Sequence, residues 1–442
     1  MSKEKQNLSK AQKKKQAKQA EPNTEIVQQD SPQNKVYERL TPKRTLKREV
    51  KTLLLQCISP IHIGSGETLK AVEYLYDSSK KIVYFLDESK WINFLFSKNL
   101  IDEFTKYVEL TAENSAKNEE FTGNNVWDWL KSKGIDAKEL PRLSIRQAHA
   151  ETNTIISGKK QTLNDIACHI AKAEGQPYIP GSSIKGIFRT AILYSFIKKF
   201  SVEKKQKYWA DIIATKVLLL KEQQKKCNEI IQTLENEIFS KLDYDTKDAQ
   251  IKSVMRGLLV SDAFVTGRGF NPKIDTVILQ KVDASTKKNR RGQAEKTLPL
   301  FRECIPAGSQ FQFTVTLDLN IMEKIGIQSV EEILTMSKEF MQNGANLLKN
   351  VFGTRYAGEF KEIEKANAFI GGGTGFIATT LLYSLAPSTD EARKFIANYF
   401  DKIFGHNHES NDTEISPRTL KLTKISKDKK QIFGLCKFQV IK

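Results

Sequence analysis

One stretch constrains the fold of this chain more than any other: PYIPGSSIKGIFRTAI, from Pro177 to Ile192. Pro180 and Gly181 interrupt a short apolar run and turn the backbone. Ser182 or Ser183 is then predicted to cap the start of a helix. Apolar residues recur at helical spacing behind this cap, so one stripe of the helix is expected to be buried. The chain therefore passes from a strand through a tight turn into a helix.

The predicted helix start has the properties of an anion-binding site. Unpaired backbone N–H groups and the positive end of the helix dipole both stabilise negative charge. Lys185 and Arg189 follow at i, i+4 spacing on one helical face. We therefore predict phosphate binding by Gly181, Ser182, Ser183, Lys185 and Arg189. A capped helix with a solvated basic face would have the same sequence, so that alternative stays open.

The segment PGSSIKGIFRTAI resembles the signature of the RAMP superfamily, the RNA-binding proteins of CRISPR effector complexes. Three other stretches match segments of that family in the same order: SPIHIGSGE (59–67), LFRECIPAGSQFQFTV (300–315) and FIGGGTGF (369–376). Together the four cover the framework from about residue 48 to 380. The length and loop pattern most resemble the fifth subunit of the Csm complex of type III-A systems.

The resemblance implies an α+β fold: a ferredoxin-like antiparallel sheet, as in RNA-recognition domains, with helices on one face. Residues 36–380 would form this core, with helical insertions at about 88–165 and 202–240 and a thumb-like loop at about 271–299. Residues 381–442 would complete the core with a C-terminal helix and strand. Residues 1–35 are rich in Lys and Gln and nearly free of large apolar side chains, so a disordered basic tail is expected.

Two glycine-rich segments, SPIHIGSGE and FIGGGTGF, are also predicted to contact RNA. Consecutive glycines allow backbone N–H groups to surround a phosphate. Neither FIGGGTGF nor PGSSIKG is a Walker P-loop, because no Lys-Ser/Thr pair follows the glycines, and nucleotide hydrolysis is not expected. The RNA-binding residues expected on the two glycine-rich segments are His62, Gly64, Ser65, Gly66, Gly371, Gly372, Gly373 and Thr374.

His62 is the one histidine of the first glycine-rich segment. A general acid or base would need a partner group, and none lies nearby in sequence. We therefore favour RNA contact or loop structure for this residue. Arg142 and Arg146 form another basic pair at i, i+4, for which an ordinary surface position is favoured over an RNA-facing one.

The segment 271–299 has a polar, basic second half. In RAMP proteins the matching segment is a thumb-like hairpin that lies against the guide RNA, so Lys281, Arg290 and Arg291 are expected to contact RNA. The alternative is a flexible basic loop.

Composition supports a polyanionic partner. The 442 residues include 70 Lys+Arg and 52 Asp+Glu, a net charge of +18, which attracts nucleic acid but also fits a soluble basic protein.

No two of the five cysteines have zinc-ligand spacing and their odd number argues against a disulfide framework, so we expect a reducing cytoplasm, no metal and no cofactor. No segment is long and apolar enough to span a bilayer, so no membrane partner is expected.

The resemblance implies a non-catalytic subunit that binds the guide RNA (crRNA) and caps the Csm complex near the crRNA 3′ end. It also implies roles in crRNA maturation and antiviral defence. The expected partners are crRNA, target RNA, the other Csm subunits, chiefly the RAMP backbone subunit, and a host trimming nuclease.

Two other function classes remain: a RAMP endoribonuclease or backbone subunit that cleaves RNA, and a purely structural interaction protein. The backbone subunit cleaves with an Asp in a loop between the first glycine segment and the PGSS-like turn. Here a long stretch, residues 68–176, replaces that loop, and Asp87, Asp136 and Asp165 lie in no matching motif. We therefore expect that the chain is not an enzyme.

Overall fold

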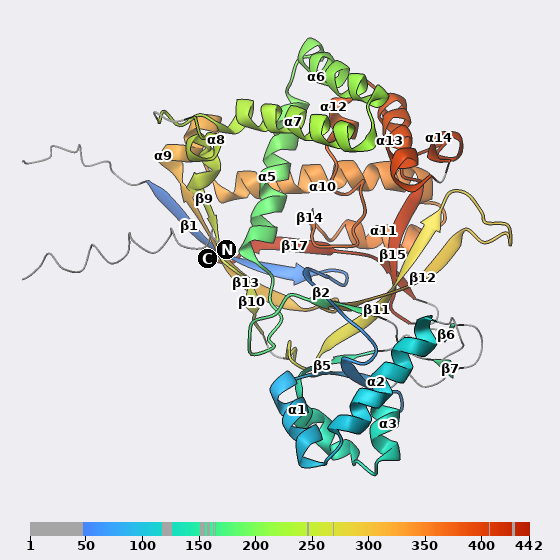
Figure 1. The fold of residues 1–442 in the computed structure, drawn as a ribbon. Helices are drawn as coiled ribbons and strands as arrows, with labels where there is room; N and C mark the ends of the chain where they lie inside the picture. The colour runs from blue at the N-terminus through green and yellow to red at the C-terminus, as the bar shows by residue number, and fades with distance from the viewer. Residues whose placement is uncertain are drawn as a thin grey trace, which may run out of the picture. The chain divides into compact units, whose positions relative to one another are not determined.

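The computed structural model describes residues 47–116, 126–150, 155–156, 160–161, 163, 165–244, 247–267, 269–405, 407–426 and 429–442. The tail expected at residues 1–35 lies outside these ranges. Residues Leu46–Lys442 form one structural unit, and most of its elements are labelled in Figure 1.

The first sheet contains the ferredoxin-like core. Its strands are β1 (Arg48–Cys57), β9 (Leu258–Val260), β10 (Phe264–Val265), β13 (Gln310–Asp318), β14 (Ala368–Phe369) and β17 (Leu435–Val440). They run antiparallel in the order β10-β13-β1-β17-β14, and β9 also pairs with β13. Helix α5 (Gly181–Lys198) lies between β1 and β9 in sequence, and α10 (Val330–Phe352) lies between β13 and β17. This βαββαβ order confirms the predicted α+β, ferredoxin-like class.

Alternation along β1 explains why α5 covers one face of this sheet. Leu53, Leu55 and Cys57 are buried, while the residues between them are only partly covered. Phe188 of α5 packs edge-on against Phe438 of β17, with ring centroids 5.3 Å apart. Burial of such rings supplies much of the free energy that joins helix to sheet.

The second sheet is mixed and is built from segments inserted into the ferredoxin-like core. Its strands run in the order β2-β8-β12-β11-β5-β4-β3, with β15 paired to β11 and β16 to β15. Their bounds are β2 (Gly64–Leu69), β3 (Tyr74–Asp77), β4 (Ile82–Leu86), β5 (Ser144–His149), β8 (Ile166–His169), β11 (Thr276–Ser285), β12 (Glu295–Cys304), β15 (Thr419–Lys424) and β16 (Lys430–Ile432). Strands β6 (Ile155–Ile156) and β7 (Lys160–Gln161) form a separate pair. Residues 271–299, expected as a thumb-like loop, contain most of the antiparallel hairpin β11–β12.

Helices occupy the early part of the first insertion, and strands β5 to β7 follow them. The helices are α1 (Glu88–Ser97), α2 (Ile101–Ala116), α3 (Val126–Ser132), η1 (Ala137–Glu139) and α4 (Leu140–Leu143). Trp91 and Trp127 are buried in a core that these helices share with β3 and β4.

The second insertion and the C-terminal part contain the remaining helices. Those of the second insertion and the segment after it are α6 (Val202–Ala214), η2 (Thr215–Val217), α7 (Leu220–Phe239), α8 (Ala249–Lys252) and η3 (Val254–Gly257). The later ones are α9 (Leu319–Met322), η4 (Glu323–Ile325), α11 (Ala357–Ile363), α12 (Leu382–Leu385), α13 (Thr389–Phe404) and α14 (His408–Asn411). Across the described residues, every helix is too short or too polar to cross a membrane.

Candidate functional site

The first and last motif segments meet at one point of the structure. The backbone N–H of Gly372 donates to the carbonyl oxygen of His62 at 2.7 Å. Gly371 has φ +85°, and a Cβ at this position would overlap the same carbonyl oxygen. Only glycine fits this close approach and this backbone conformation. The third segment joins them, because Ile61 and Ile305 exchange two backbone hydrogen bonds of 3.0 and 2.8 Å.

His62 is a buried structural residue of this junction. Its side chain and backbone together are only 4% exposed, and Nδ1 donates to the carbonyl oxygen of Glu303 at 2.7 Å. Burial lowers the pKa of His62 to about 4, so its ring is neutral at pH 7. Gly64, Ser65 and Gly66, the residues of β2 that follow, are exposed. Gly66 has φ +92°, and Ser65 Oγ accepts from the Glu67 N–H at 3.1 Å.

Sequence reasoning missed His169, which packs edge-on against His62 with ring centroids 6.1 Å apart. Both of its ring nitrogens are engaged: Nδ1 accepts from the Ile63 N–H at 3.1 Å, and Nε2 donates to the Tyr178 carbonyl at 3.1 Å. Burial also lowers the pKa of His169 to about 4. The two histidines therefore hold backbone segments together.

A buried ion pair between Arg146 and Glu303 lies beside this junction. Glu303 is fully buried and accepts from Arg146 Nε at 2.9 Å and Nη2 at 3.0 Å. The Arg146 guanidinium also lies over the Phe85 ring, 4.4 Å from its centroid. The prediction of a surface pair with Arg142 was wrong, because Arg142 lies on α4 and pairs with Glu139 at 3.6 Å, whereas Arg146 lies on β5. No local pattern announces a partner 157 residues away.

The start of α5 differs from the prediction. The N-cap residue is Pro180, without a side-chain hydrogen bond, and Ser182 and Ser183 lie in the first turn, so the predicted serine cap was wrong. A Cβ on Gly181 would overlap backbone oxygens of the neighbouring β9 segment. This close approach brings Asp262 Oδ1 within 2.8 Å of the Gly181 N–H. A carboxylate of the protein thus occupies part of the predicted anion site.

Lys185 and Arg189 have different electrostatic surroundings. Burial lowers the pKa of half-buried Lys185, and no described carboxylate forms an ion pair with it. The Arg189 guanidinium forms an ion pair with Glu235 of α7. At Lys185 a phosphate would therefore meet a cation that pairs with no described carboxylate. At Arg189 it would have to compete with the carboxylate of Glu235.

One groove joins the α5 start to the glycine-rich loop. It has a volume of about 300 Å³ and is lined by Ser183 and Gly186 of α5 and by Gly371 and Thr374 of the loop. The Thr374 hydroxyl donates to the Gly371 carbonyl at 3.3 Å and is mostly buried. The structure thus brings PGSSIKG and FIGGGTGF, more than 180 residues apart, onto the same groove.

Gly373 of the same loop lies close to the side chain of Arg302, a basic residue that sequence reasoning missed. A Cβ on Gly373 would lie 2.9 Å from Arg302 Nη1. This nitrogen is buried, and among the described residues no acceptor meets it. Arg302 stands inside the matched segment LFRECIPAG, so its motif was the available signal.

Lys281 lies on β11 beside further positive charge. Its ammonium and that of Lys421 contact the two carboxylate oxygens of Asp283 at 3.4 and 3.0 Å. Burial lowers the pKa of Lys281, and repulsion from Lys421 and Arg302 adds to this shift. Arg290 and Arg291 lie exposed at the turn of the β11–β12 hairpin, so the structure separates them from the α5 groove.

The described residues offer little to a metal ion or a disulfide. Within them, no three His, Cys, Asp or Glu side chains cluster in a way that could hold a metal. All five cysteines are free thiols, of which four are buried.

Known proteins resemble this chain over a range that contains all four segments. A family model described as the RAMP superfamily matches residues 54–403. A protein of Mycobacterium tuberculosis (strain CDC 1551 / Oshkosh) named CRISPR system Cms protein Csm5 is 26% identical over 386 residues, covering 84% of this chain and 93% of its own. A protein of the same name from Streptococcus thermophilus is 28% identical over 273 residues, which cover 61% of this chain and 65% of the relative. Another, from Enterococcus italicus, is 22% identical over 379 residues, which cover 79% of this chain and 84% of the relative.

A solved structure shares the fold. One chain of a Csm-crRNA-target RNA ternary complex of a type III-A CRISPR-Cas system superposes with a TM-score of 0.59. The superposition covers 88% of this chain and 100% of that one, at 16% sequence identity.

Proposed function

The chain belongs to the RAMP superfamily, and from this membership we propose that it is an RNA-binding subunit of a type III-A Csm effector complex. It caps the complex near the 3′ end of the crRNA, takes part in crRNA maturation and thereby serves antiviral defence. The names of its curated relatives support this proposal, since each is a Csm5 protein.

The observation that carries the proposal is the meeting of the four motif segments. One groove is lined by Ser183 and Gly186 of α5 and by Gly371 and Thr374 of the glycine-rich loop. That loop contacts the first glycine-rich segment through the Gly372–His62 hydrogen bond, and Lys185 on α5 adds a cation for phosphates. Base identity plays little part in such contacts, so binding follows the RNA backbone. The proposed RNA-contacting residues are Gly64, Ser65, Gly66, Gly181, Ser182, Ser183, Lys185, Arg189, Lys281, Arg290, Arg291, Gly371, Gly372, Gly373 and Thr374, with His62 acting through its loop.

The proposed partners are crRNA, target RNA and the other Csm subunits, chiefly the RAMP backbone subunit. A host nuclease that trims the crRNA is a further proposed partner. A chain of the same fold in a Csm-crRNA-target RNA complex supports the first three.

A non-catalytic role agrees with the state of the candidate acids. Asp87 caps α1 by accepting from the Lys90 N–H at 3.1 Å, and Asp136 caps η1 in the same way at 2.8 Å. Asp165 forms an ion pair with Lys70. Each carboxylate thus has a structural task, and none stands beside the groove in a set of acids and bases.

The test places 4-thiouridine near either the 3′ or the 5′ end of a crRNA and assembles it into the whole Csm complex with this chain. We expect crosslinks to this chain from the 3′ label, and crosslinking from the 5′ label alone would contradict the proposal. Incubation of the same complex with RNA and Mg²⁺ tests the cleaving alternative. Cleavage that disappears in an Asp165→Asn variant of this chain would favour an endoribonuclease instead.

A further inference from the structure

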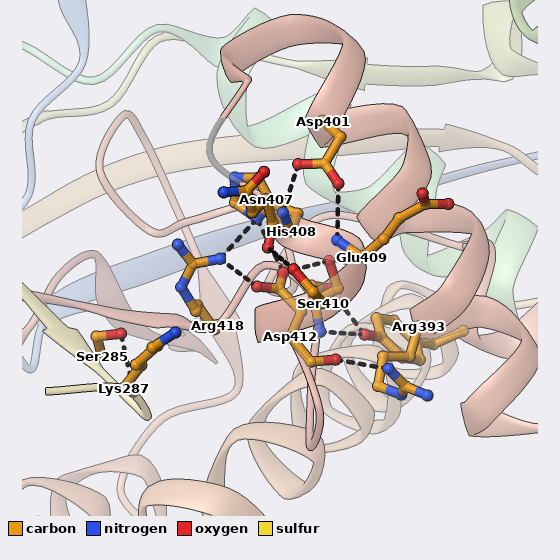
Figure 2. Close-up of polar contacts among 12 residues, drawn as sticks. Ser285, Lys287, Arg393, Asp401, Asn407, His408, Glu409, Ser410, Asp412 and Arg418 are labelled. Atoms are coloured by element: carbon orange, nitrogen blue, oxygen red, sulfur yellow. Dashed lines mark hydrogen bonds and ion pairs between the residues drawn. The ribbon is translucent and has the colours of Figure 1, made fainter.

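A second cleft in the described part of the molecule lies between the β11–β12 hairpin and the C-terminal helices. It has a volume of about 670 Å³, within the range of small-ligand sites. The hairpin forms one wall, and α13, α14 and the start of β15 form the other. Figure 2 shows the polar contacts around this C-terminal wall. Phe376, directly after the glycine-rich loop, also lines the cleft, so this cleft adjoins the RNA-binding segments already described.

The C-terminal wall presents an aromatic surface. Phe400 and Phe404 are stacked with ring centroids 5.7 Å apart and an interplanar angle of 18°. Phe376 packs edge-on against Phe400 at 5.2 Å, which holds the inner ring in place. Phe404 is 53% exposed, although it is a large apolar residue at the cleft. A half-exposed ring on a fixed neighbour is a surface on which a flat heterocycle can stack.

The cleft is lined by more cations than carboxylates, and these cations lie on the hairpin and on β15. Lys281 and Lys421 share the single carboxylate of Asp283. Lys288 and Lys296 line the same cleft, and no described acidic group forms an ion pair with either. Glu295 is the other acidic lining residue, and it is already engaged by Lys430 at 2.5 Å and the Tyr356 hydroxyl at 2.8 Å. The cleft therefore retains positive charge that an anion would neutralise.

Buried hydrogen bonds hold the aromatic wall in position (Figure 2). Asp412 is fully buried and accepts from Arg418, from the Ser416 hydroxyl at 2.7 Å and from His408 Nδ1, 2.9 Å away. Asp401 of α13 accepts from the Glu409 N–H at 2.8 Å and fixes the turn into α14. A wall held in this way loses little conformational freedom when a ligand binds.

We propose that this cleft binds an unpaired nucleotide of single-stranded RNA, with the base stacked on Phe404 and the adjoining phosphates on Lys288, Lys296 and Lys421. The inference rests on the proposed RNA-binding function and extends it to a second wall, formed by the C-terminal helices. A nucleotide combines a flat ring with a fixed negative charge, which matches an aromatic wall opposite a cationic one. An acidic protein segment would use the cations but leave the stacked rings without a role.

The test measures the affinity of the full chain for a fluorescently labelled single-stranded RNA at one fixed salt concentration. Phe404→Ala should weaken binding by about 5- to 100-fold, as the loss of one base–aromatic stack does. Phe404→Trp should retain wild-type affinity, since indole also stacks. Phe96→Ala is the matched control, because Phe96 is a 73% exposed phenylalanine on α1 outside the cleft, and it should bind as the wild type. Equal melting temperatures would show that the variants are folded.

The outcomes separate this inference from the proposed function. RNA binding by the wild type that is unchanged in Phe404→Ala overturns the inference and leaves the proposed function standing. No RNA binding by the wild type, alone or in the assembled complex, overturns both. As a second readout, 4-thiouridine RNA in the assembled complex should crosslink to the peptide that contains Phe404. Crosslinks from the RNA to other peptides of this chain, with none to the peptide that contains Phe404, would overturn the inference.

Discussion

Removal of Arg146 is expected to be among the most destabilising single changes in this protein. The Glu303 side chain has no exposed surface and the Arg146 side chain is 10% exposed. Glu303 accepts hydrogen bonds from Arg146 Nε and Nη2, from the Thr276 hydroxyl at 3.3 Å and from the His169 N–H at 3.0 Å. Arg146→Met removes two of these donors and leaves the carboxylate charge buried without its cation. A loss of about 3–5 kcal/mol in the free energy of unfolding follows from breaking such a pair on one side.

The assay is urea-induced unfolding followed by circular dichroism at pH 7. Arg142→Met is the control, because Arg142 has a 76% exposed side chain and its ion pair should contribute less than about 1 kcal/mol. The double change Arg146→Met, Glu303→Gln removes the buried charge as well, so it should be more stable than Arg146→Met alone, with a coupling of about 0.5–3 kcal/mol. Equal stability of the Arg146→Met and Arg142→Met variants would refute this account of the pair.

Four further outcomes are expected. Gly371→Ala should lower the melting temperature, because its Cβ would overlap a backbone oxygen at φ +85°, whereas Gly358→Ala, with open space around it, should not; equal melting temperatures would count against the close approach. The two buried histidines of the junction have pKa values of about 4, below the unfolded value, so the unfolded chain binds more protons and urea-measured stability should fall from about pH 6.5 toward pH 4. His169→Gln should flatten that profile, and stability that rises on acidification would contradict it. Lys185→Gln should cost about 1–3 kcal/mol of RNA affinity, and Arg189→Gln less, because Arg189 must first leave its carboxylate partner; the reverse order in fluorescence anisotropy would refute this ranking. Affinity for single-stranded RNA should also fall with salt, with a log–log slope of about −0.7 per phosphate contacted, and a flat response would exclude phosphate binding.

Local pattern was a sound guide to the core and a poor one to the helix cap. The helical spacing of Ile184, Phe188 and Ile192 predicted a buried stripe, and all three are fully buried. The predicted serine cap was wrong because the helix begins earlier in the chain, at Gly181, where the backbone packs against the β9 segment. The Gly181 N–H donates to Asp262 Oδ1 of that segment. A cap chosen by tertiary packing leaves no trace in the few residues around the turn.

For the predicted binding residues, the sequence likewise indicated their order along the chain but not their contacts in space. Resemblance placed the glycine-rich segments correctly in chain order, but it could not show that Gly372 contacts His62 or that Thr374 shares a groove with Ser183. The C-terminal wall of the larger cleft was missed entirely, since Phe404 reads in sequence as one more apolar position of an amphipathic helix. Its exposure depends on where α13 lies against the hairpin.

The sequence by itself determined the turn into α5 and the buried apolar stripe of that helix, and its motifs carried the resemblance that implied the α+β class. The helix depends on the period of its apolar residues, which is a local property. Only the tertiary structure decided that Arg146 is buried against Glu303, and that Arg189 pairs with Glu235 while no described carboxylate pairs with Lys185. Such outcomes depend on which side chains the sheet register and helix packing bring within a few ångströms, and partners far apart in the chain acquire that proximity only when it folds.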